Sequence, residues 1–288
     1  LKSSKQPLII AGGGVLYSEA EKELSDFAKK HNIPVTPTVM GIGCMDRDDP
    51  YNMGPIGALG VGGANFLSKD TDLAIAIGTK LGDFTTGSWS NFNNNNFKLV
   101  SINAARFDVI KHRATPVVSD AKIGLKELSK KLGDWKAPDT WYQLGVSETK
   151  KWDSYVEKQS GPTNQKEPSY AHAIGAIYRN ADSSDIVVTA AGGLVGETVQ
   201  IWKPKKINTF ETEWGFSCMG YEISGALGIK MAKPDQDVIV FIGDGSYLLA
   251  NSDIYSSVIY DQKLIIIVCD NGGHMVINRL QLAKGGKE

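Results

Sequence analysis

The sequence has little cysteine or histidine and no excess charge of either sign. Its 288 residues include three separated cysteines, no CxxC pair and four scattered histidines, so a disulfide framework, a zinc site or a Ser-His-Asp triad has little support. The cysteines are typical of reduced thiols in a cytoplasmic protein. Lys+Arg number 31 and Asp+Glu 32, which gives a net charge of −1. We therefore expect no nucleic-acid partner.

Long hydrophobic runs are also missing. No apolar stretch approaches the ~18 residues that a membrane-spanning helix needs, so we expect no membrane partner. Residues 1–7 show no signal-peptide core. Hydrophobic residues make up 42% and charged residues 22%, a globular composition, whereas glycine is abundant at 31 residues. Glycine in clusters is typical of turns that approach a ligand closely.

Short apolar runs alternate with helical patterns along most of the first half. The run 8–10 ends at Gly12–Gly14 and predicts a buried strand, and Ser18 with Glu21 predicts a capped helix. Further strands are predicted at 72–78, 98–103 and 117–118, and a helix at 121–132. Residues 139–159 form a helical pattern with aromatic anchors. We expect a domain at 1–133 and a linker with a helix at 134–168.

The second half repeats this alternation and predicts another domain at 169–288. Strands are predicted at 185–189, 207–210, 237–242 and 263–269, and helices at 169–178, 219–231 and 248–260. Apolar strands without polar alternation are typical of parallel sheets that are buried on both faces. The fold class is therefore α/β, with two doubly wound parallel-sheet domains.

Two polar turns in the second domain carry the chemistry. Gly243–Ser246 and Asp270–Gly273 each follow an apolar strand, and ligands of open parallel sheets bind at the carboxyl ends of the strands. Asp244 offers a carboxylate oxygen and Asn271 an amide oxygen, while the neighbouring glycines let phosphate groups approach the backbone. Such oxygens suit Mg²⁺ shared with a substrate or cofactor diphosphate. Two unrelated turns are the alternative, since Asp-Gly and Asn-Gly are ordinary turn dipeptides.

The spacing of these turns resembles a known signature. Gly-Asp-Gly, 24 residues and then Asp-Asn is similar to the thiamine diphosphate (ThDP) signature of the acetolactate synthase superfamily, with Asp270 in place of the usual first asparagine. The resemblance implies that Asp244, Asn271 and the backbone carbonyl of Gly273 bind Mg²⁺. It also implies that the turn around the aspartate contacts the cofactor through Gly243, Asp244, Gly245 and Ser246, together with Asn271.

Two further segments resemble the same superfamily in the expected order. Residues 215–220 resemble the loop that holds the aminopyrimidine, which implies backbone contacts from Ser217 and Met219 and makes Met219 the apolar wedge beneath the cofactor. Residues 191–196 resemble the other diphosphate-side loop. Contacts there are expected from Gly192, Gly193 and Leu194 through backbone amides, because the side chains after the glycines are apolar.

The first half resembles the middle, Rossmann-like domain of the same superfamily. The resemblance rests on Gly12–Gly14, residues 54–65 and residues 72–83. Some members bind FAD in this domain through an arginine, where this chain has Lys80. Lysine lacks the planar fork of arginine, so we expect no FAD.

Within the superfamily, residues 81–88, 214–222, 243–248 and 277–281 resemble the trihydroxycyclohexane-1,2-dione hydrolases of inositol catabolism. This implies ThDP- and Mg²⁺-dependent hydrolysis of a C–C bond in a small cyclic 1,2-dione. Residues 273–276 depart from that family's usual Gly-Phe-Gly-Cys, which leaves open whether His274 or Met275 touches the substrate. Alternatives are an acetolactate synthase or related 2-oxo acid ligase or lyase, and a non-catalytic nucleotide-binding module.

The superfamily's catalytic glutamate resides in an N-terminal pyrimidine-binding domain, and nothing in this sequence matches that domain. We therefore expect the chain to be a fragment that lacks it, with the diphosphate-binding domain incomplete at its C-terminus. The resemblance further implies a homodimer or homotetramer with the active site at the subunit interface.

Overall fold

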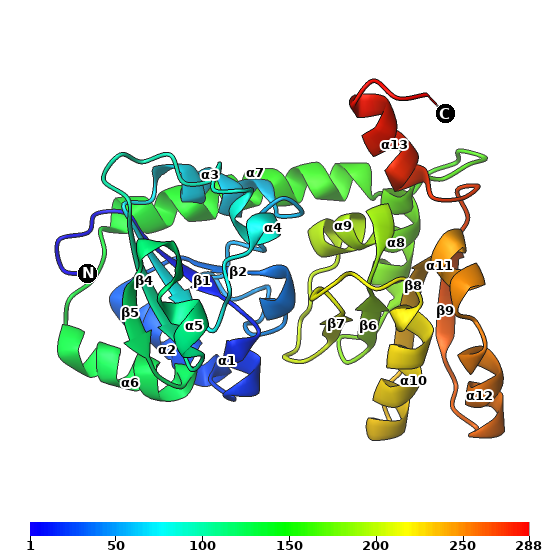
Figure 1. The fold of residues 1–288 in the computed structure, drawn as a ribbon, viewed down its shortest axis with the longest axis horizontal. Coiled ribbons are helices and arrows are strands. Elements are labelled where there is room, and N and C mark those ends of the chain that lie inside the picture. The colour runs from blue at the N-terminus through cyan, green and yellow to red at the C-terminus, as the bar shows by residue number, and fades with distance from the viewer. Residues whose placement is uncertain (288) are drawn as a thin grey trace. The chain divides into compact units, whose positions relative to one another are not determined.

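The computed structural model describes residues 1–287, which divide into two compact units. The first comprises Leu1–Lys158 and Lys203–Asn208, and the second comprises Gln159–Trp202 and the chain from Thr209 onward. Each unit contains one sheet in which every strand pair is parallel (Figure 1). This confirms the α/β class with two parallel-sheet domains.

The first unit is built on a five-stranded sheet with the order β2-β1-β3-β4-β5. Its strands are β1 (Pro7–Ala11), β2 (Val35–Pro37), β3 (Leu73–Ile77), β4 (Lys98–Asn103) and β5 (Thr115–Val118). Its helices are α1 (Gly14–Tyr17), α2 (Glu21–His31), α3 (Gly62–Asp70), α4 (Asp83–Thr86), α5 (Arg106–Val109), α6 (Ala121–Leu132) and α7 (Asp139–Gln159).

Helices cover both faces of this sheet because successive residues of a strand point to opposite sides. Ile9 of β1 packs in a core cluster with Phe27 of α2 and Leu125 of α6. Its neighbour Ile10 packs in a separate cluster with Leu67 of α3 and Trp141 of α7. Two apolar layers on one sheet are the arrangement of a doubly wound domain.

The glycine turn after β1 packs tightly against the turn after β3. The backbone nitrogen of Gly12 donates to the Ile77 carbonyl at 2.8 Å, and that of Gly14 donates to the Gly78 carbonyl at 3.0 Å. A Cβ on Gly12 would lie 2.3 Å from the Gly78 carbonyl oxygen. Glycine is therefore required at Gly12 because the two strand ends approach each other at backbone distance.

The second unit is built on a four-stranded sheet with the order β7-β6-β8-β9. Its strands are β6 (Ile186–Thr189), β7 (Phe210–Thr212), β8 (Val238–Gly243) and β9 (Ile265–Cys269). Its helices are α8 (Tyr170–Asn180), α9 (Gly192–Ile201), α10 (Tyr221–Ala232), α11 (Asp244–Leu249), α12 (Asp253–Ile259) and α13 (Met275–Ala283). None of the helices in residues 1–287 is both long and apolar enough to cross a membrane.

Two of the predicted helix boundaries are wrong. Ser18 does not cap the helix that follows it: it ends the short helix α1, donating its backbone nitrogen to the Gly14 carbonyl, and α2 begins at Glu21. The single helix predicted over 248–260 is two helices, α11 and α12, separated at Ala250 by an extended backbone with φ −150°. The apolar pattern did not indicate this break, because apolar residues continue from α11 into α12.

Candidate functional site

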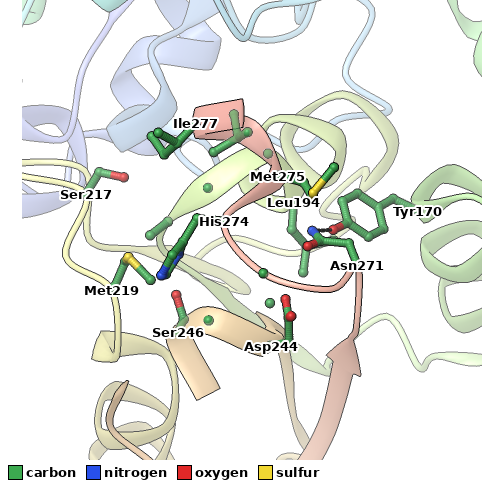
Figure 2. Close-up of a pocket in the computed structure, with 17 residues that line it drawn as sticks. Tyr170, Leu194, Ser217, Met219, Asp244, Ser246, Asn271, His274, Met275 and Ile277 are labelled. Atoms are coloured by element: carbon green, nitrogen blue, oxygen red, sulfur yellow. Dashed lines mark hydrogen bonds between the residues drawn. The ribbon is translucent and has the colours of Figure 1, made fainter. Parts of the chain in front are cut away.

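A pocket lies at the carboxyl ends of β6 and β8, which are neighbours in the second sheet. From β6 the chain continues to β7 on one side, whereas β8 and β9 lie on the other. This reversal of strand order is the position at which open parallel sheets bind ligands. The pocket has a volume of about 250 Å³ and is lined by the segments that follow β6, β8 and β9 (Figure 2).

All of the residues that the sequence predicted for cofactor and metal binding line this one pocket. They come from three strand ends and one loop, and the two outermost, Gly192 and Gly273, are 81 residues apart in sequence. The structure places there Gly192, Gly193, Leu194, Ser217, Met219, Gly243, Asp244, Gly245, Ser246, Asn271 and Gly273. Their contacts with a cofactor or a metal stay predictions, whereas their convergence is an observation.

At several glycines of the pocket, no side chain covers the backbone. A Cβ added to Gly192, Gly243 or Gly273 would have no other atom within 4 Å. Gly192 and Gly273 also have φ values of +78° and +133°, a conformation that other residues rarely adopt. The pocket therefore offers open backbone surface that a phosphate group can approach closely.

The oxygen donors expected for a metal lie on one side of the pocket. Asp244 is the first residue of α11 and is half-buried, and Asn271 follows β9 (Figure 2). Among residues 1–287 no three His, Cys, Asp or Glu side chains converge on a metal position. One carboxylate, one amide and a backbone carbonyl leave coordination positions for diphosphate oxygens and water, which suits Mg²⁺.

The orientation of Asn271 is set by a residue that the sequence analysis missed. The Asn271 side-chain nitrogen donates a hydrogen bond to the phenol oxygen of Tyr170, the first residue of α8. Tyr170 also lines the pocket. The two residues are 101 positions apart in the chain, so no local pattern links them.

The loop before α10 is held by Glu213. Its carboxylate accepts hydrogen bonds from the backbone nitrogens of Phe216 at 2.9 Å and Cys218 at 2.7 Å. Burial raises the pKa of Glu213, but hydrogen bonds from Phe216, Cys218 and Gly215 together outweigh it, so the pKa lies below its ordinary value. Ser217 has φ +55° and donates its hydroxyl to the Ala190 carbonyl at 3.1 Å. The backbone beside Met219 is therefore fixed from two sides.

His274 and Met275, which the sequence left open, both line the pocket. His274 lies on the side opposite Asn271, beside Met219 and Ser246 (Figure 2). A Cβ on Gly245 would lie 2.7 Å from a ring carbon of His274. The ring therefore occupies space that a side chain at residue 245 would fill, which gives a packing reason for glycine there.

Comparison with protein families decides the class of this site. Residues 1–128 match the thiamine pyrophosphate enzyme central domain, and residues 190–288 match the thiamine pyrophosphate enzyme C-terminal TPP-binding domain. The chain carries two domains of the thiamine pyrophosphate (TPP) enzyme family. The pocket lies within the C-terminal TPP-binding domain, apart from Tyr170, which precedes the matched residues.

Curated relatives within this TPP enzyme family are similar over nearly the whole chain. Proteins named 3D-(3,5/4)-trihydroxycyclohexane-1,2-dione hydrolase are 37% identical in Geobacillus thermodenitrificans and 36% identical in Clostridium tetani. A protein of the same name in Bacillus anthracis is 35% identical. Each comparison covers 99% of this chain and 48% of the relative. The chain therefore spans about half the length of the curated relatives it matches.

Proposed function

We propose that this chain supplies the diphosphate- and metal-binding part of a ThDP- and Mg²⁺-dependent hydrolase. The substrate of the whole enzyme is 3D-trihydroxycyclohexane-1,2-dione, a cyclic polyhydroxy 1,2-dione of inositol degradation, whose ring C–C bond is cleaved. The observation that carries the proposal is the convergence of the predicted residues on one pocket at a strand-order reversal. The names of the relatives support the substrate.

The donor chemistry of the pocket fits magnesium diphosphate. Asp244, Asn271 and the Gly273 carbonyl would hold Mg²⁺, and the bare backbone at Gly192 and Gly243 would lie against the diphosphate. Asp244 is well suited to this role because its carboxylate makes no hydrogen bond or ion pair with another residue among 1–287. A metal would supply the partner that this half-buried charge lacks.

Other residues of the pocket would orient the cofactor and limit access of water. Ser217 and Met219 would contact the cofactor through backbone groups on the loop that Glu213 holds, and the Met219 side chain, which lines the pocket, would be the apolar wedge. Leu194 is buried on the α9 side and keeps that wall apolar. When bound, ThDP would supply a carbon nucleophile for a substrate carbonyl.

The proposed substrate is tested by comparing two reactions of the whole enzyme. Purified protein with Mg²⁺ and ThDP is incubated with the cyclic dione or with pyruvate, and the products are identified by mass spectrometry. We expect a ring-opened acid from the dione and no acetolactate from pyruvate. Acetolactate formation without dione cleavage would instead assign the protein to the acetolactate synthases.

The proposal extends to assembly, location and the first unit. Exposed apolar residues on α11 and α12, among them Leu249 and Val258, support a homodimer or homotetramer with the active site at the subunit interface. Sedimentation of the whole enzyme tests the oligomeric state.

We place the enzyme in the cytoplasm because its cysteines are free, as is typical of proteins in a reducing compartment. For the first unit we keep the expectation that no FAD binds, because Lys80 lacks the planar fork of arginine; flavin absorbance in purified protein would contradict it.

A further inference from the structure

Glu222 is a buried carboxyl group whose role the cofactor signature does not explain. It is the second residue of α10 and only 1% exposed. Its Oε1 accepts a hydrogen bond from the Ala191 backbone nitrogen at 3.3 Å, and its Oε2 accepts one from the Gly220 backbone nitrogen at 2.9 Å. The Ser246 side chain donates a third hydrogen bond to the same carboxyl group.

The three donors belong to three of the segments that surround the pocket. Ala191 precedes the glycines that begin α9, Gly220 follows Met219, and Ser246 lies in the first turn of α11, which begins at Asp244. These segments are far apart in sequence and belong to different strand connections. One side chain therefore joins the predicted diphosphate loop, the predicted pyrimidine loop and the predicted metal turn.

We propose that Glu222 is a positioning residue that holds these three segments in the conformation that binds ThDP and Mg²⁺. The proposal rests on the proposed function, because it concerns the same pocket. Glu222 is not among the residues that line the pocket, so it acts through Ala191, Gly220 and Ser246.

The chemistry of the side chain explains why glutamate is needed. A carboxylate presents two acceptor oxygens, and here both oxygens face backbone N–H groups. Glutamine has the same shape, but its NH₂ group would oppose one of these donors, so one connection would be lost. Burial raises the pKa of Glu222, partly offset by hydrogen bonds that include those from Gly220, Ala191 and Ser246.

The raised pKa of Glu222 predicts that its replacement affects ThDP binding more than it affects the stability of the fold. A carboxyl group whose folded pKa lies above its unfolded value favours folding at low pH, and that contribution is lost as the pH rises through the folded pKa. At neutral pH the charge of Glu222 therefore carries a desolvation cost, which Glu222→Gln removes together with one hydrogen bond. We expect this variant to unfold within a few degrees of the wild-type Tm while binding ThDP about tenfold more weakly.

The experiment compares Glu222→Gln with Glu211→Gln in the whole enzyme. Glu211 is a matched control because it is a half-buried glutamate on β7 of the same unit, with a pKa also raised by burial, and it does not line the pocket. Calorimetry measures the Kd of ThDP with Mg²⁺, and hydrogen exchange measures protection at 191–193, 217–220 and 244–246. We expect weaker binding and faster exchange at all three segments only in Glu222→Gln.

Each result decides between the two proposals. Unchanged exchange in Glu222→Gln, or an equal loss of affinity in Glu211→Gln, would overturn the positioning role. Wild-type protein that binds no ThDP would refute the proposed function, whereas the exchange comparison would still test Glu222. If Glu222→Gln fails to fold, Ser246→Ala removes a single connection, and faster exchange confined to 244–246 is the result that supports the proposal. No change there would contradict it.

Discussion

Asn271 donates the hydrogen of its side-chain amide to Tyr170, and this fixes which atom of the amide is available to a metal. The amide nitrogen is engaged by the phenol, so the carbonyl oxygen Oδ1 is the group left for another partner. Mg²⁺ takes oxygen ligands and is not bound by an amide NH₂. In this arrangement the contact with Tyr170 leaves Oδ1 of the otherwise exposed Asn271 side chain available for the proposed Mg²⁺.

Removing the phenol oxygen with Tyr170→Phe should weaken magnesium-dependent ThDP binding. A hydrogen bond of this kind contributes roughly 0.5–1.5 kcal/mol, which corresponds to about a 2- to 13-fold loss of affinity. Isothermal titration calorimetry with and without Mg²⁺ measures the effect. Tyr255→Phe is the matched control, because Tyr255 is 72% exposed on α12 and does not line the pocket. Equal affinities of the two variants would show that Tyr170 does not orient Asn271.

Removing the carboxylate with Asp244→Ala should abolish the dependence of ThDP binding on magnesium. Asp244 is the single acidic side chain in the lining of the pocket as described over residues 1–287, so no other carboxylate can neutralise the cation. Asp244→Asn keeps an oxygen ligand without the charge and should retain part of the effect. The comparison variant Asp235→Ala removes the same charge from an exposed position. ThDP affinity that still rises with Mg²⁺ in Asp244→Ala would refute the metal assignment.

The sequence predicted the sheets and the pocket well because strong local signals mark both. Apolar runs located β6, β8 and β9, whereas β7 begins at Phe210, the last residue of the strand predicted at 207–210. Gly243 ends β8, and the turn that holds Gly273 follows β9. Parallel strands present their carboxyl ends at one edge, so the predicted residues could be brought together without knowledge of the contacts between helices.

The contacts that orient the site could not be predicted in the same way. Tyr170 and Glu222 reach the pocket through pairings of 101 and 31 residues in sequence separation, and either residue is unremarkable within its own helix. Helix α13 was also missed, because the glycines before His274 indicate a loop and its apolar side chains are not buried. Side-chain partners of this kind depend on packing that periodicity does not encode.

The buried imidazole of His31 predicts acid sensitivity of the first unit. Its Nδ1 contacts the Trp135 carbonyl at 2.7 Å and its Nε2 contacts the Ser129 hydroxyl at 3.1 Å, so the neutral ring donates to the carbonyl and accepts from the hydroxyl. Burial lowers the pKa of His31, although the Trp135 carbonyl opposes the shift. His31 therefore binds a proton at a higher pH in the unfolded chain than in the folded chain.

Stability should consequently fall as the pH is lowered below the unfolded value of about 6.5. Above that pH both states are neutral at His31 and the residue makes no pH-dependent contribution. Thermal unfolding between pH 7 and pH 5 should show a steeper loss of Tm in the wild type than in His31→Gln, which cannot bind the proton. Parallel curves for the two proteins would assign the acid sensitivity to other groups.

The close approach of Gly12 to Gly78 predicts a strong steric effect in the first unit. In Gly12→Ala the new Cβ would lie 2.3 Å from the Gly78 carbonyl oxygen and 2.6 Å from the Thr79 Cβ, and that carbonyl is held by the hydrogen bond from the Gly14 backbone nitrogen. Overpacking of this kind costs about 1–3 kcal/mol or more, since the backbone itself must shift. Gly82→Ala is the control, because a Cβ there would have no neighbour within 4 Å and φ is −68°. We expect Gly82→Ala to change the free energy of unfolding by no more than about 0.5 kcal/mol.

Denaturant titrations followed by tryptophan fluorescence measure the stability of both variants. Trp141, which packs in the core cluster that contains Ile10 of β1, is one of the reporting tryptophans. Similar stabilities of the two variants would mean that the two strand ends can separate enough to accommodate a methyl group.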